Sequence, residues 1–251
     1  MTARPLPAKL GNEPLIDVVC GVHFNSDVPV EALLPGLLLP MFAGKQPKFE
    51  TLPVAQLPQV VRDSDPNLQS APLMRVVVDE RFTVLIGSRG LAVGCQMPYA
   101  GWAAFKAMIQ TVFSVLRQVP SITAIGRHSL KYVDFVRSHG TQMTLSRFEL
   151  KIEIAGRKVS DQATQLRTEL VESPFLHAIT IVSPATVNQP GNESANGAVV
   201  DVDTHRIEGF EVNRFLELLP QLLDEIHSAN KKIFFALLSE EGLKELDPHY
   251  D

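Results

Sequence analysis

Three side chains that could bind a metal ion or transfer protons follow one another at two-residue intervals in the stretch AVVDVDTHR. They are Asp201, Asp203 and His205. Carboxylates and imidazoles are common ligands of divalent metals and act as general acids and bases. Side chains alternate across a strand, so all three would share one face, yet one ion could contact only two neighbours because each residue step is about 3.3 Å. The pattern favours a solvated strand face, with a metal or catalytic site completed by distant residues as the alternative.

Other residues with reactive side chains are scattered along the chain. His128, within GRHSLKY, would sit on a strand from which it could reach a cleft and join that site. The seven histidines form no HxH or HExxH pattern, and the chain contains neither a GxSxG elbow nor a glycine-rich phosphate loop. Cys20 and His23 would point to opposite faces of a strand, which argues against a Cys–His dyad. We therefore predict no bound metal and no cofactor.

Basic residues supply the candidates for binding rather than catalysis. Arg127 and Lys131 would share a strand face and form a small cationic patch, and His227 and Lys231 lie one helical turn apart. An anion or a nucleic acid would suit such a patch. However, the net charge of −5 and the pI of about 5.8 give no general basic excess, which a sequence-independent nucleic-acid binder requires. Nucleic-acid binding through a curved sheet face is therefore the third function that we consider.

The composition is that of a folded globular protein. The chain has 251 residues, of which 45% are hydrophobic and 20% are charged, and this predicts a single compact domain over 1–251. Cys20 and Cys95 lie in apolar runs, which favours buried free thiols and a reducing cytoplasm. No apolar run approaches the roughly 20 residues that span a membrane, so we expect no membrane partner.

The first half of the chain alternates short apolar runs with proline-rich segments. We expect a strand over 14–24 and one or two short helices over 28–42, broken at Pro35. Residues 43–71 suggest a surface loop with an edge-strand turn near Gln59–Arg62. Three runs then predict an antiparallel meander, and the spacing of the following aromatic and aliphatic residues predicts a helix. The runs are 74–78, 82–87 and 91–95, and the helix covers 99–119.

The second half begins with a long strand over 121–138 and a cleanly alternating one over 147–156. Residues 175–187 and 198–203 are further strands, and 165–172 fits either a strand or a helix. A long amphipathic helix covers 212–238, with a kink or a new start at Pro220, and Ser239 caps a final short helix. The order of a hairpin followed by a helix thus occurs twice. This predicts an α+β fold, with antiparallel β-meanders, amphipathic helices packed on one face and two pseudo-repeated halves, 1–120 and 121–251.

Four sets of residues also resemble the pattern of a known family. They are Asn12, Pro14 and Leu15; Tyr99, Trp102 and Phe105; Lys131 and Tyr132; and His227, Lys231 and Phe234. Together they resemble a sporadically distributed prokaryotic family whose members have a similar length and no established activity. The family usually has Arg where this chain has Lys131. The resemblance implies one fold over nearly the whole chain, and a sporadic distribution fits accessory or defence-associated genes.

The absence of a catalytic pattern makes a non-enzymatic protein-interaction protein our first hypothesis, with another protein as its partner. The alternatives are a metal-dependent or acid–base enzyme near Asp201, Asp203 and His205, and the nucleic-acid binder described above. We also expect a homodimer, because exposed strand edges are covered by pairing and the apolar segment 28–42 offers a contact.

Overall fold

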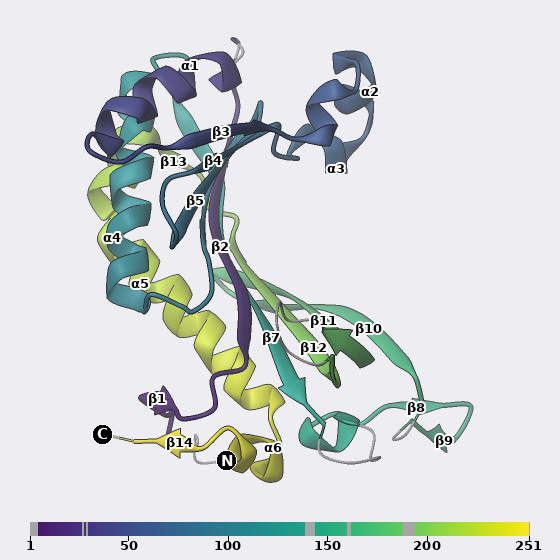
Figure 1. The fold of residues 1–251 in the computed structure, drawn as a ribbon. Helices are drawn as coiled ribbons and strands as arrows, with labels where there is room; N and C mark the ends of the chain where they lie inside the picture. Colours follow the sequence, from purple (N-terminus) through teal and green to yellow (C-terminus); the bar gives the residue numbers. More distant parts are fainter. Residues whose placement is uncertain are drawn as a thin grey trace. The chain divides into compact units, whose positions relative to one another are not determined.

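The structure is a computed structural model that describes residues 5–26, 28, 30–138, 144–159, 162–187 and 194–250 (Figure 1). Within these ranges the chain forms a large antiparallel sheet together with helices, which confirms the predicted α+β class. The strands of this sheet are β2 (Leu15–Phe24), β3 (Lys48–Thr51), β4 (Met74–Val77), β5 (Phe82–Ile86), β6 (Gly90–Cys95), β7 (Ala124–Arg137), β10 (Thr164–Glu172), β11 (Phe175–Val187), β12 (Ala195–Arg206) and β13 (Phe210–Glu211). Their order is β10-β11-β12-β7-β2-β6-β5-β4-β3, and β13 pairs with β7.

Two small sheets and a set of helices complete the fold. β1 (Lys9–Leu10) pairs with β14 (Pro248–His249), and β8 (Glu153–Ile154) pairs with β9 (Arg157–Lys158). The helices are α1 (Val30–Leu38), η1 (Leu39–Phe42), η2 (Pro53–Gln56), α2 (Gln59–Ser64), α3 (Pro66–Gln69), α4 (Trp102–Phe113), η3 (Ser114–Gln118), η4 (Thr144–Arg147), α5 (Val212–Leu237) and α6 (Glu240–Glu245). None of the helices that the structure describes is both long enough and apolar enough to cross a membrane.

The chain divides into two compact units, each built from segments that are distant in the sequence. Unit 1 contains residues 1–16, 131–204 and 227–251, and unit 2 contains 17–130 and 205–226. The predicted repeat of two similar halves is not confirmed. The single domain and its halves, 1–120 and 121–251, stay predictions.

The core of unit 2 lies on one face of the meander that the sequence predicts. Along β5 the buried residues alternate, and they line up across the sheet with the buried residues of β2 and β6. Both cysteines are buried there as free thiols. The helix predicted over 99–119 is α4 followed by η3, and it buries its apolar stripe, which consists of Phe105, Ile109, Val112, Phe113 and Leu116. An amphipathic helix is thereby stabilised mainly by packing.

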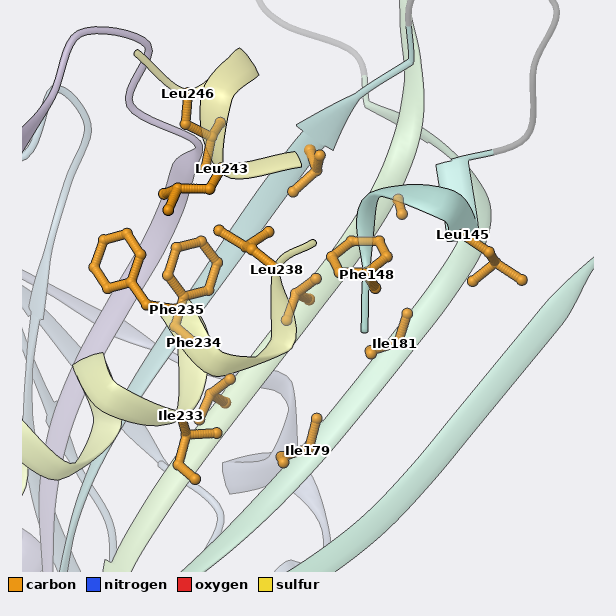
Figure 2. Close-up of a cluster of buried hydrophobic side chains, with 14 residues drawn as sticks. Leu145, Phe148, Ile179, Ile181, Ile233, Phe234, Phe235, Leu238, Leu243 and Leu246 are labelled. Atoms are coloured by element: carbon orange, nitrogen blue, oxygen red, sulfur yellow. The ribbon is translucent and has the colours of Figure 1, made fainter. Parts of the chain in front are cut away.

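The core of unit 1 joins the end of α5 and the turn of α6 to strands β11 and β12 (Figure 2). Ile233, Phe234 and Phe235 of α5 meet Ile179 and Ile181 of β11 in one buried cluster. Leu243 of α6 and Leu246 just after it also belong to this cluster, as do Leu145 and Phe148 from the region of η4. Side chains from three separate parts of the sequence therefore make this core, so its composition follows from the tertiary fold.

Two predicted segments are wrong, for different physical reasons. The strand predicted over 147–156 is reduced to the two-residue β8, although burial does alternate from Phe148 to Ile152. Phe148 finds only an isolated bridge to Leu238, and a strand needs a continuous neighbour for its backbone groups. The edge-strand turn predicted at 59–62 is the helix α2, and the edge strand of this region is β3.

Pro35, predicted to break a helix, and Pro220, predicted to kink one or start a new one, both lie inside continuous helices. Pro35 is within α1, and a 3₁₀ turn begins only at Leu39; Pro220 is within α5. A proline removes one backbone hydrogen bond, but the buried side chains on either side of it hold the helix in place. For Pro220 these are Phe215, Leu219 and Leu223, all in unit 2.

Gly242 gives a testable case of close backbone packing. The hydroxyl of Ser239 accepts a hydrogen bond from the Gly242 N–H at 3.1 Å, which confirms the predicted N-cap of α6. A Cβ at Gly242 would lie 2.3 Å from the carbonyl oxygen of Arg147. We expect Gly242→Ala to lower the free energy of unfolding by about 1–3 kcal/mol, measured by urea denaturation. Gly36→Ala is the control, because apart from its chain neighbours and the nearby backbone of its own helix no atom lies within 4 Å of its Cβ position; equal losses in both variants would contradict the prediction.

Candidate functional site

The three residues AspxAspxHis lie on β12 as the sequence predicts, alternating with buried side chains. Asp201, Asp203 and His205 are half-buried rather than fully solvated. Asp201 and Asp203 belong to unit 1 and His205 belongs to unit 2. Asp201 forms an ion pair with Lys131 at 2.7 Å. Within the described ranges, no group of three or more His, Cys, Asp or Glu side chains is arranged to hold a metal ion.

The two basic candidates on β7, Arg127 and Lys131, each contact a different side chain. In unit 2 the Arg127 guanidinium lies 3.0 Å from His23 Nε2, and in unit 1 Lys131 is paired with Asp201. Burial, assisted by the charge of Arg127, lowers the pKa of His23 to about 4, so its ring is neutral at pH 7. The predicted cationic patch is thus divided between two local contacts.

His128 lies in the core of unit 2 and not at a cleft. It is 1% exposed, its ring centroid lies 5.6 Å from that of Phe215, and neither ring nitrogen has a hydrogen-bond partner. Burial lowers its pKa to about 4, with Arg206 lowering it further and Glu225 opposing. A neutral, enclosed imidazole of this kind has no route to a substrate.

His227 and Lys231 contact different partners within unit 1. Tyr132 Oη lies 3.1 Å from His227 Nδ1, and the Lys231 ammonium lies 5.9 Å from the centroid of the Phe235 ring. The first contact joins α5 to β7, and the second lies within α5. They support a packing role for both residues.

Asp134, which sequence reasoning missed, is the most perturbed carboxyl group in the described chain. It is 5% exposed on β7 in unit 1. Burial raises its pKa to about 8, and the negative charges of Glu13 and Asp201 add to the rise. An ionisable group perturbed in this way is typical of functional sites, although buried structural groups show it too. The available signal was an aspartate flanked by the apolar residues Val133 and Phe135.

A pocket of about 340 Å³ lies in unit 1 and is lined in part by the β7 residues that follow Asp134; Asp134 itself is not in its lining. Its lining includes Asn12, Glu13, Phe135, Arg137 and Glu245. Arg147 holds Glu245 in place, with its Nη2 atom 2.6 Å from Glu245 Oε1. The Asn12 amide donates to the backbone oxygen of Glu245 at 2.9 Å. The pocket therefore combines carboxylate, guanidinium and amide groups with an aromatic wall.

A different kind of site is formed by α2 in unit 2. This helix has no buried residue, and three apolar side chains there face outward: Leu57 just before it, then Val60 and Val61. Val60 is 80% exposed. We call these three residues the α2 surface. Figure 1 shows α2 and α3 together beyond the end of β3.

Long, incomplete polar contacts attach α2 to the rest of unit 2. Arg62 Nη1 donates to Ser88 Oγ at 3.4 Å, and Ser88 Oγ donates to Glu31 Oε1 at 3.4 Å. Arg62 Nε and Glu31 Oε2 are buried without a hydrogen-bond partner. A buried polar atom without a partner costs free energy. A shift of α2 that gave Arg62 Nε and Glu31 Oε2 hydrogen-bond partners would therefore lower the free energy of the protein.

Comparison with known proteins does not assign a function to the chain, so the proposal below is based on the structural features described above. The sequence matches no protein-family model and no curated protein.

Proposed function

We propose that this chain is a non-enzymatic protein that acts by binding another protein through the α2 surface. The observation that carries the proposal is that α2 exposes two valines and contains no fully buried residue. A helix of six residues is not stable in water by itself, and an apolar face normally packs against a core. A partner that covered Val60 and Val61 would supply the missing packing.

The chemistry of the partner follows from the exposed face of α2. Val60 and Asp63 are three residues apart and share a helix face. Both are exposed. The matching surface on the partner would present apolar side chains to the valines and a basic side chain to Asp63. The unpaired Arg62 and Glu31 atoms support an adjustment of α2 during binding.

The experiment begins with a photo-crosslinking residue at position 60 in the native host, and mass spectrometry identifies the captured protein. Binding is then measured with the purified partner. We expect V60D/V61D to weaken the complex at least ~30-fold, the effect of losing an interface hot spot of about 2 kcal/mol. Asp63→Lys should also weaken binding.

The matched control is Ile154→Asp, which changes an apolar side chain of 66% exposure on β8 in unit 1. It should leave the affinity unchanged. Equal crosslinking from positions 60 and 154, or an affinity that V60D/V61D does not alter, would contradict the proposal. A melting temperature close to that of the unmodified protein will show that the variants are folded.

A second candidate function, acid–base catalysis, is supported by Asp134 alone. A carboxyl group that keeps its proton at pH 7 can donate it to a bound substrate. The pocket lined by the next residues of β7 would then hold a small polar molecule between Glu13 and Arg137. Thermal-shift screening of small polar metabolites at pH 6 tests this: a ligand should stabilise the unmodified protein and lose affinity in Arg137→Ala. The nucleic-acid alternative gains no support, because Arg127 and Lys131 contact His23 and Asp201.

A further inference from the structure

The strand β10 forms one end of the sheet order and lies outside β11 in Figure 1. It pairs antiparallel with β11 over nine residues, from Thr164 opposite Ser183 to Glu172 opposite Phe175. Among the described residues no strand pairs with its other side. Such an edge presents unpaired N–H and C=O groups and is a template for another strand. Natural proteins usually shorten or disrupt an edge of this length, which makes β10 a candidate interface.

The sequence of β10 is complementary to itself in one antiparallel register. If Thr168 lies opposite Thr168 of a second copy, each Arg167 faces a Glu169 and each Leu166 faces a Leu170. Two-fold symmetry makes each of these pairs occur twice. Opposite charges and apolar side chains that face each other across two strands stabilise a sheet, whereas like charges destabilise it. Centring the pair on Arg167 or Glu169 instead would bring like charges together, so the charges disfavour those two registers, and the Thr168 register pairs Arg167 with Glu169.

The side chains already point to the faces that this pairing requires. Arg167 and Glu169 share one face, where Arg167 Nη1 lies 3.2 Å from Glu169 Oε1, and both side chains are at least half exposed. Leu166 and Thr168 lie on the opposite face, in register with Ile181 and Ile179 of the unit 1 core. A second copy would therefore extend the apolar face of the sheet while the charges pair on the other face.

We propose that the protein forms a homodimer in which β10 pairs antiparallel with β10 of a second copy, centred on Thr168. The interface is separate from the α2 surface and does not depend on the proposed partner. It also differs from the contact first expected over 28–42. That segment buries Val30, Leu34 and Leu38 in unit 2 and leaves only Leu33 and Leu39 strongly exposed among its leucines.

The test uses charge exchange in the full-length chain, with the mass followed by light scattering over a concentration series. Arg167→Glu places two glutamates opposite two others, and Glu169→Arg places arginines opposite arginines. We expect each single variant to raise the dimer dissociation constant at least ~10-fold. The double variant R167E/E169R should dimerise like the unmodified protein. An equimolar mixture of the two single variants should also dimerise, because every charged pair is then opposite in sign.

The control is Arg157→Glu, the same charge change on an exposed residue of β9 in unit 1. It should leave the dimer intact, as should V60D/V61D. A protein that is monomeric at all concentrations would overturn the proposal. A dimer that neither single variant weakens, or single variants that fail to recover when mixed, would overturn it as well. Unchanged melting temperatures will show that the variants are folded.

Discussion

Replacing Asp134 with asparagine should raise the free energy of unfolding at pH 7 by about 4 kcal/mol. The folded-state pKa is about 8, against an ordinary value of 3.8, mainly because the carboxyl group is buried. Between these two values the folded chain keeps a proton that the unfolded chain releases. Stability therefore falls as pH rises from about 4 to about 8 and then levels off. Each pH unit within that interval contributes about 1.4 kcal/mol. Asparagine has a similar shape and no charge, so it removes this cost.

Urea denaturation of the two proteins at pH 5, 7 and 9 checks this result. The difference between them should be smallest at pH 5, about 1.7 kcal/mol, and largest at pH 9, and the variant should show the flatter pH profile. Glu217→Gln, a change at an exposed carboxylate of α5, should alter stability by less than about 0.5 kcal/mol. If Asp134→Asn were less stable at every pH, the carboxylate would have to be charged and bonded in the folded state.

Asn230→Ala should lower the free energy of unfolding by about 2–4 kcal/mol. Asn230 is 1% exposed, and its side-chain amide donates to the Val202 carbonyl at 2.8 Å and to Thr204 Oγ1 at 3.0 Å. His177 Nδ1 lies 2.9 Å from the same hydroxyl. Alanine would leave a cavity and buried acceptors without donors in unit 1. The three side chains form one network that ties α5 to β11 and β12.

The comparison for this variant is Ser228→Ala, at an exposed position of the same helix. It should change the unfolding midpoint in urea only slightly. Thr204→Val tests whether the network acts as a unit. Its effect combined with Asn230→Ala should be smaller than the sum of the two separate effects. Additive losses would show that Asn230 and Thr204 contribute independently.

The segments that the sequence predicted correctly are those whose structure depends on local patterns. The meander β4–β6 follows from period-two apolar runs with turn residues between them, and α4 follows from apolar residues at three- and four-residue spacing. Ser239 caps α6 because the cap needs only its hydroxyl and the backbone of Gly242. Each of these depends on neighbours within a few residues. The order of the predicted strands and helices likewise indicated the α+β class.

The tertiary structure decided which polar residues are buried and which charged groups lie near them. Asp134 is perturbed because folding buries it near Glu13 and Asp201, which come from distant parts of the chain. The AspxAspxHis pattern was conspicuous in the sequence, yet the structure gives Asp201 an ion pair with Lys131. The apolar neighbours of Asp134 on its strand hint at its burial, but its charged neighbours are far apart in sequence, so no local pattern could reveal them.

The same distinction applies to the two surfaces that we propose for binding. Residues 59–62 were expected to form an edge-strand turn, and 165–172 fitted either a strand or a helix; α2 and β10 emerged only when their neighbours were in place. The sequence by itself determined the class of fold, the periodic strands and helices and the free cysteines. Which strand lies at an edge, which helix lacks a core and which carboxyl group keeps its proton depend on long-range packing. Only the tertiary structure could decide these features.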